Sequence, residues 1–212
     1  MSAGTGWDTL ASRYDRQLGL ERAAIREALD LAAPHPDDDL LDVGTGTGAA
    51  LRELAASSER PTRVVGVDPS RAMLDRAPSL PFGWSLQIAD ARCLPFPDDS
   101  FQVVLAVYVL HVIAPQDRRT VLAEMRRVLT PGGRLVAVTP VVPRAPVGRA
   151  VAVALAGLAR VAPRRFGGLR TYDPRPALEN AGFRLVRARY VRRGYLSLCV
   201  VAGDATPASD AS

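Results

Sequence analysis

Runs of apolar residues recur along the first two thirds of the chain, and most are followed by a turn and a stretch with helical spacing. The five runs span residues 40–43, 64–68, 85–90, 102–110 and 134–140. Most are apolar throughout, which predicts strands buried on both faces, because a strand with one face in water alternates apolar and polar residues. Strands that alternate with helices are typical of a parallel sheet. The sequence therefore predicts an α/β fold, a parallel sheet with helices on both faces.

The segments that flank this core predict no second domain. We expect a single domain over residues 1–204, with N-terminal helices at 8–32, a core at 38–140, an insertion at 141–172 and a C-terminal helix and hairpin at 173–203. A helix is also expected at 116–129, before Pro131. The hairpin would supply the antiparallel pairing at the end of the sheet. We expect residues 205–212 to form a disordered tail.

The composition excludes several classes of enzyme. All 27 basic residues are arginine, so mechanisms that need a Schiff-base amine or a phosphate-loop lysine are excluded. The stretch 144–193 contains 12 arginines against Asp173 and Glu179. Such a stretch can face an anionic ligand, a membrane surface, nucleic acid or only solvent. Two cysteines and no export leader predict a cytoplasmic protein with reduced thiols.

A glycine-rich turn follows the first apolar run. Gly44, Gly46 and Gly48 stand where a strand passes into a helix, a place that needs a tight turn and lets a ligand approach the backbone closely. Read as G-x-G-x-x-A with Ala49, the same residues satisfy a dinucleotide fingerprint, and Asp68 lies at about the ~20-residue distance expected for a ribose contact. The turn alone therefore leaves the ligand open.

Two further acids favour a zwitterionic ligand that carries an adenosine. Asp42 stands inside the strand before the turn, where it suits an ammonium group better than a pyrophosphate. Asp90 ends the third predicted strand and precedes Ala91, so a carboxylate and a backbone N–H could read an adenine edge. With Asp68, three successive strand ends each offer one acid at the carboxyl edge of the sheet, where ligands of open α/β folds bind.

On these residues the chain resembles the class I S-adenosylmethionine-dependent methyltransferases, and within them the small-molecule branch related to the quinone-ring methyltransferases. The matching segments are WDTLASRYD (7–15), LLDVGTGTG (40–48), VVGVDPSRAML (64–74), IADARCLPFPDDSFQVVLAVYVLHVI (88–113) and EMRRVLTPGGRLVAVTP (124–140). The resemblance implies a Rossmann-like, doubly wound, seven-stranded sheet with one antiparallel strand. It also implies S-adenosyl-L-methionine as cofactor. The usual F-D before the fourth strand is Phe101–Gln102 here, at a position that is normally structural.

The resemblance further implies cofactor contacts along the carboxyl edge. The methionine part would meet Tyr14, Asp42, Gly44, Thr45, Gly46, Gly48 and Val107, the last through its carbonyl. The adenosine part would meet Asp68, Met73, Asp90 and Ala91. The alternative for the glycines is an ordinary buried turn, and for Asp68 and Asp90 it is a helix N-cap. Tyr14 and Met73 could also be plain core residues.

Methyl transfer from a sulfonium is an in-line displacement whose main demand is positioning, and a base is not required for every acceptor. If a base assists, the chain offers only His35 and His111 as imidazoles, and His111 follows the fourth strand, next to the expected methyl group. His111 is thus the candidate catalytic residue, and its alternative is a residue that only packs beside the cofactor. No metal-ligand spacing is present.

The sequence leaves three functions open. The first is O- or C-methylation of a small, largely apolar metabolite such as a polyketide, quinone or aromatic intermediate. The second is a lipid-directed N-methyltransferase at an anionic membrane, and the third is a non-catalytic cofactor-binding module. Nucleic acid is not expected as a partner, because Val107–Tyr108–Val109–Leu110 replaces the D/N-P-P-Y/F segment of base-amino methyltransferases. We expect residues 141–172 to form a substrate lid.

Overall fold

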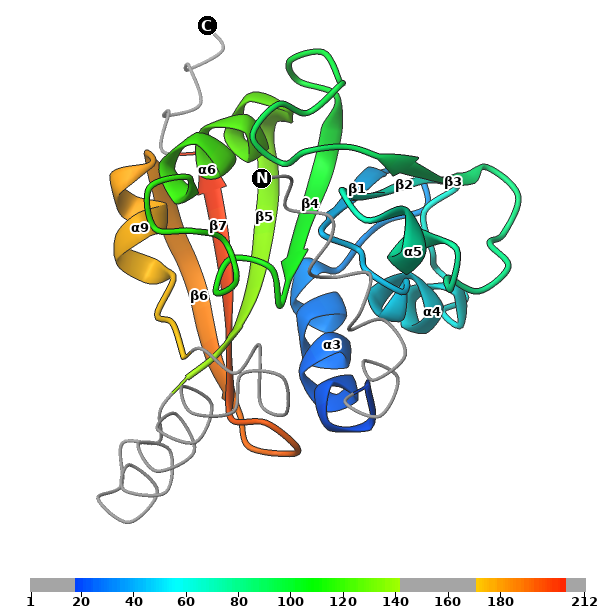
Figure 1. Ribbon diagram of the computed structural model, residues 1–212, viewed down its shortest axis with the longest axis horizontal. Coiled ribbons are helices and arrows are strands. Elements are labelled where there is room, and N and C mark those ends of the chain that lie inside the picture. The colour runs from blue at the N-terminus through cyan, green and yellow to red at the C-terminus, as the bar shows by residue number, and fades with distance from the viewer. Residues whose placement is uncertain (1–17, 142–170, 205–212) are drawn as a thin grey trace, which may run out of the picture.

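Seven strands form one sheet in the computed structural model, which describes residues 18–141 and 171–204. They are β1 (Asp39–Val43), β2 (Arg63–Asp68), β3 (Trp84–Ile88), β4 (Phe101–Val107), β5 (Leu129–Pro140), β6 (Phe183–Val191) and β7 (Ser197–Asp204). Their order is β3-β2-β1-β4-β5-β7-β6, and β7 runs antiparallel to both of its neighbours (Figure 1). The predicted Rossmann-like sheet with one antiparallel strand is confirmed.

Helices cover both faces of this sheet. They are α3 (Leu18–Ala32), α4 (Ala49–Ala55), α5 (Arg71–Leu74), α6 (Arg118–Arg127) and α9 (Arg175–Asn180). Successive residues of β1 enter different cores: Leu40 belongs to the core that includes residues of α3 and α4, and Leu41 to the core that includes residues of α6 and α9. This double burial explains why most of the predicted runs are apolar throughout.

Two strand boundaries differ from the prediction by three residues or more. β4 ends at Val107, because Tyr108 turns the chain with a φ of 54°. β5 begins at Leu129, five residues before the predicted start, because Leu129 pairs with Phe101 before a register shift accommodates the following Pro-Gly-Gly segment. The boundaries therefore depend on pairing between strands, which the local pattern does not contain.

The insertion leaves and re-enters the fold at the carboxyl end of β5. Val141 N donates to Leu196 O at 3.0 Å, and Tyr172 N donates to Pro140 O at 2.8 Å. Residues 142–170, which contain most of the predicted lid, lie outside the described residues, as do 1–17 and 205–212. Within the described ranges, no helix has the length and apolar character needed to cross a membrane.

Arg134 on β5 ties the end of α3 to the sheet. Its guanidinium donates to the carbonyl oxygen of Ala32, to that of Ala33 at 2.8 Å and to the Asp38 carboxylate at 2.8 Å. These carbonyls belong to the last turn of a helix, where no intrahelical donor reaches them. Arg134 thereby fixes where α3 lies.

We expect Arg134→Met to lower the free energy of unfolding by about 2 kcal/mol, because partly buried acceptors lose a charged donor. The control is Arg63→Met, since Arg63 also pairs with an aspartate at 2.8 Å but its side chain is 60% exposed. That variant should lose less than about 1 kcal/mol. Urea unfolding measures both, and equal losses would contradict the anchoring role of Arg134.

Candidate functional site

The glycine turn after β1 is fastened to the end of β2. Gly44 N and Thr45 N both donate to Val67 O, at 2.8 and 3.0 Å. Gly44 has a φ of 71°, and a Cβ on it would lie 2.5 Å from Cγ2 of Val109. Both the left-handed backbone and the close approach of the chain after β4 therefore require glycine at this position.

Asp68 at the end of β2 joins two loops. Its Oδ2 accepts from Gly46 N at 3.0 Å, and its Oδ1 accepts from Ser70 N at 2.9 Å. The carboxylate is 9% exposed, and burial raises its pKa while the two backbone N–H groups oppose that rise. Asp68 is thus an oriented carboxylate with lone pairs left for a ligand.

Asp42 is the second buried carboxylate at this edge. Its Oδ2 accepts from the Thr45 hydroxyl at 2.6 Å. Burial raises the pKa of Asp42 to about 6, the Thr45 hydrogen bond lowers it, and the nearby charge of Asp68 adds to the rise. An added positive charge would relieve this electrostatic cost.

A cavity of about 300 Å³ opens beside these loops. Six of the residues predicted to bind the cofactor line it: Gly44, Gly46, Asp68, Met73, Asp90 and Ala91. The opposite wall is apolar and comes from the segment after β4, including Val109, Val112 and Ile113. The sheet therefore gathers residues from four strand ends around one cavity.

Other predicted site residues do not line this cavity. They are Asp42, Thr45, Gly48, Val107 and His111. The Thr45 hydroxyl is directed to Asp42, Gly48 is the N-cap of α4, and Val107 is the last residue of β4. Tyr14 lies outside the described residues.

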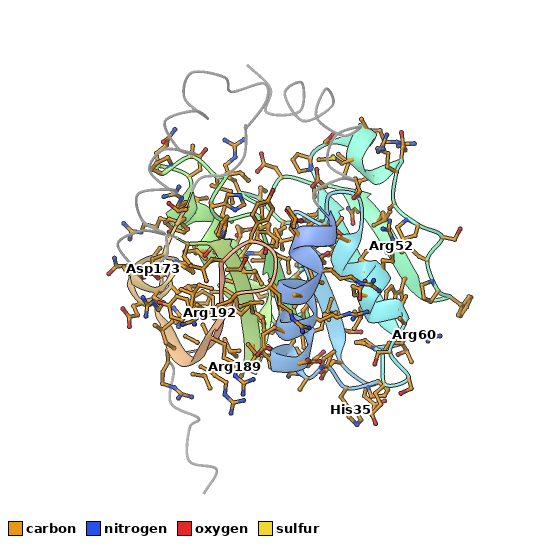
Figure 2. All side chains as sticks on the ribbon, turned by 90° about the horizontal axis from the view of Figure 1, so that it is seen from below. His35, Arg52, Arg60, Asp173, Arg189 and Arg192 are labelled. Carbon is orange, nitrogen blue, oxygen red and sulfur yellow. The ribbon has the colours of Figure 1, made fainter. Side chains whose placement is uncertain are left out.

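Both histidines are placed by the structure. His111 is buried, and its ring meets the Tyr108 ring edge-on with 6.2 Å between centroids. His35 lies in the loop after α3 with a side chain that is 71% exposed, at the periphery of the molecule (Figure 2). His111 is therefore the imidazole near the site.

The Asp90 carboxylate is engaged by Arg92. The guanidinium Nη2 lies 2.6 Å from Oδ2, and Arg92 N donates to Oδ1 at 2.9 Å. These bonds hold the pKa of Asp90 below its usual range. Arg92 also lies 3.6 Å from Asp117, and both residues line the cavity. Sequence reasoning missed this arginine, which adjoins the predicted adenine site.

Tyr108 and Glu21 were also missed. Tyr108 lines the cavity, although its position inside an apolar run predicted only a strand. Glu21 lies on the apolar stripe of α3 formed with Ile25, Ala28 and Ala32, and it is only 6% exposed. A charged residue at an apolar position of a helical pattern was the signal that could have identified it.

Comparison with known proteins agrees with this geometry. Residues 40–133 match the methyltransferase domain family. The chain is 34% identical over 141 residues to the ubiquinone/menaquinone biosynthesis C-methyltransferase UbiE of Geotalea daltonii, covering 61% of this chain and 59% of that protein. It is 39% identical over 137 residues to the demethylmenaquinone methyltransferase of Deinococcus radiodurans, covering 60% of this chain and 56% of that protein.

Among solved structures, a SAM-dependent methyltransferase from Aquifex aeolicus superposes with a TM-score of 0.66 at 20% identity, over 92% of this chain and 97% of that one. The fold is thus the one found in this solved methyltransferase. Over residues 40–133 the chain is therefore similar to S-adenosylmethionine-dependent methyltransferases, in which S-adenosylmethionine is the methyl donor. It spans less than two thirds of the length of the two curated relatives.

The buried Asp42 makes stability depend on pH. Its pKa in the folded protein is raised from 3.8 to about 6, so the folded protein binds the proton more tightly than the unfolded chain does. The contribution of Asp42 to the free energy of unfolding is therefore largest in acid and is lost as the pH rises through about 6. Asp42→Asn removes the ionisation but leaves an oxygen that can accept from Thr45. The free energy of unfolding of this variant, relative to that of the wild type, should rise by about 1 kcal/mol between pH 5 and pH 8.

Urea unfolding at both pH values measures the gain. Asp75→Asn is the control, because Asp75 is an aspartate with a 61% exposed side chain in an ion pair with Arg71. A difference between Asp42→Asn and wild type that stays constant from pH 5 to pH 8 would show that burial does not perturb Asp42.

Proposed function

We propose that this protein transfers the methyl group of S-adenosylmethionine to a ring carbon of a small, largely apolar hydroquinone. One observation carries the proposal: the Asp68 carboxylate, fixed by Gly46 N and Ser70 N, faces a cavity whose opposite wall is apolar. The relatives named as quinone methyltransferases support the choice of acceptor.

The charges around the cavity fit this cofactor. Asp68, Asp90 and Asp117 line the cavity with Arg92, and Asp42 lies buried at the end of β1. Carboxylates suit a sulfonium, an ammonium group and ribose hydroxyls, whereas a dinucleotide pyrophosphate would be repelled. When bound, the cofactor supplies a methyl group already activated by positive sulfur.

We assign the following roles to the residues. Asp68 accepts from the ribose hydroxyls, and Met73 lies against the adenine. Ala91 N donates to the adenine edge, while Asp90 can accept from the adenine amino group only after the exposed Arg92 side chain leaves one of its oxygens. Asp42 compensates the ammonium charge.

The methionine part is assigned to the turn and the neighbouring strand. The backbone of Gly44, Thr45, Gly46 and Gly48 surrounds it, with the Val107 carbonyl and Tyr14 completing its site. The positive φ values of Gly44, Gly46 and Gly48 support this assignment, because they leave the backbone open to close approach.

An apolar acceptor would lie against the segment that follows β4. Val109, Val112 and Ile113 offer an apolar wall that excludes water, and both ends of the 141–172 insertion return to this same edge. Transfer needs the acceptor atom, the methyl carbon and the sulfur in line, so holding the acceptor against this wall supplies most of what the reaction needs. His111, packed behind Tyr108, supports the shape of this wall.

A lipid amine is the second acceptor that an observation favours. The β6–β7 hairpin reaches the carboxyl edge, and Arg189 and Arg192 lie at the surface of this hairpin (Figure 2). Such a basic surface suits an anionic bilayer. The apolar wall inside the cavity favours the quinol over a charged headgroup, and the assay below separates the two.

The test is transfer of label from radiolabelled S-adenosylmethionine to demethylmenaquinol or to vesicles of phosphatidylethanolamine and phosphatidylglycerol. We expect label in the quinol and none in the lipid amine.

Asp68→Ala should weaken cofactor binding by about 2–3 kcal/mol in calorimetry, because the ribose hydroxyls lose their contact with a buried carboxylate. Asp75→Ala, on the exposed end of α5, is the matched control.

Label found only in the lipid amine would contradict the quinol acceptor. Absence of label from every acceptor, with tight cofactor binding, would contradict methyl transfer itself. An Asp68→Ala variant that binds like wild type would overturn the assignment of the cavity.

A further inference from the structure

A second polar cluster lies at the carboxyl edge of the sheet, where the first turn of α3 meets the β6–β7 hairpin. Tyr195 N donates to Leu20 O at 3.2 Å, which fixes the hairpin against that turn. The Tyr108 hydroxyl lies 2.6 Å from Ser197 Oγ, and Ser197 Oγ donates to Tyr195 O at 3.0 Å. Glu21, the residue after Leu20, completes the cluster.

Glu21 directly follows Leu20, whose carbonyl oxygen accepts from Tyr195 N, so this buried glutamate lies next to the hairpin residues of the cluster. Burial raises the pKa of both Tyr108 and Tyr195, and the negative charge of Glu21 adds to the rise in each, which places all three groups in one electrostatic environment. The other titratable groups facing Tyr108 are Cys199, on β7, and His111. None of the ion pairs between described residues includes Glu21, so no arginine of residues 18–141 and 171–204 forms an ion pair with it.

Burial makes Glu21 a stronger base than an ordinary glutamate. The residue is 6% exposed, and burial raises its pKa to about 7. A buried carboxylate without a cation is costly, and a chain that needed only packing here would place an apolar residue on this stripe. A group with a pKa near the working pH is suited to accept and return a proton.

Tyr108 separates this cluster from the cofactor cavity. The residue lines the cavity, yet its hydroxyl reaches Ser197 on β7. Its backbone has a φ of 54°, unfavourable for a tyrosine, and its N–H is held by Val138 O at 2.9 Å. A strained backbone that aims a side chain between two polar sites is typical of functional positions.

From this juxtaposition we propose that Glu21 is the proton acceptor for the methyl acceptor's hydroxyl, and that the Tyr108 and Ser197 hydroxyls position that acceptor. The inference rests on the proposed hydroquinone methylation. It places the reacting hydroxyl on the α3 side of Tyr108, next to the cofactor cavity.

The acceptor's O–H proton moves to the Glu21 carboxylate, and the ring carbon next to that oxygen uses its electron pair to bond the methyl carbon. The carbon–sulfur bond breaks, and its electron pair stays on sulfur, which becomes a neutral thioether. The ring carbon then loses its hydrogen as a proton to water, and Glu21 returns its own proton to the ring oxygen.

The test compares Glu21→Gln with Glu27→Gln, a change on the same helix at an exposed ion pair with Arg189. With demethylmenaquinol, we expect Glu21→Gln to lower kcat by about 10²–10⁴-fold and to abolish the rise in kcat across pH 7. Glu27→Gln should keep both the rate and the pH profile. Affinity for S-adenosylhomocysteine should stay unchanged in both variants, since neither residue lines the cofactor cavity.

A measurement that needs no turnover accompanies the assay. Infrared difference titration of the wild-type protein should show a protonated carboxyl band that disappears near pH 7, is absent in Glu21→Gln and moves when the unreactive quinone binds. This readout also reports on Glu21 if Glu21→Gln folds poorly.

Tyr108→Phe should raise KM for the acceptor more than it lowers kcat.

The proposal is overturned if Glu21→Gln keeps the wild-type rate, or if it loses rate with an unchanged pH profile, because a structural role would do the latter. It is also overturned if the infrared band does not respond to the quinone. A wild-type protein that methylates no quinol would instead contradict the proposed function.

Discussion

The Asp68 carboxylate ties together the loops that form the candidate cofactor site. Its two oxygens accept from Gly46 N, in the turn after β1, and from Ser70 N, in the turn after β2. The parallel pairing of β1 with β2 brings these turns to one edge, and a third turn arrives through the pairing of β1 with β4. Because all three loops converge on Asp68 and the glycines, the position of the cavity follows from the topology of the sheet.

This edge of the sheet contains several buried carboxylates, although folded proteins normally keep such charged groups in contact with water. Burial raises the pKa of Asp42, Asp68 and Glu21, and each of these carboxylates costs stability when ionised. The first two suit a cationic, hydroxyl-rich cofactor, and the third suits a hydroxylated acceptor. In the proposed function, the same residues that lower stability supply the chemistry of the two halves of the site.

Most of the fold could be predicted from the sequence, because most of the buried strands contain a continuous apolar run and glycine or proline marks many of the turns. Asp68 and Asp90 could be predicted because an acid at the end of a parallel strand must lie at the carboxyl edge, and the glycine turn predicted Gly44 and Gly46, whereas Met73 came only from the family resemblance. The pairing of Arg92 with Asp90 was missed because three of its four hydrogen bonds are made by an arginine side chain whose direction no pattern predicts. The contact between Tyr108 and Ser197 joins residues 89 positions apart and depends on the pairing of β5 with β7.

A crystal structure of the protein with S-adenosylhomocysteine tests the central claim most directly. The account predicts adenosine in the cavity beside the glycine turn, with the ribose hydroxyls at hydrogen-bond distance from the Asp68 carboxylate and the adenine between Met73 and Ala91. The homocysteine sulfur should point toward Tyr108. A ligand bound elsewhere, or an Asp68 carboxylate that contacts only Gly46 and Ser70 when the site is saturated, would contradict it.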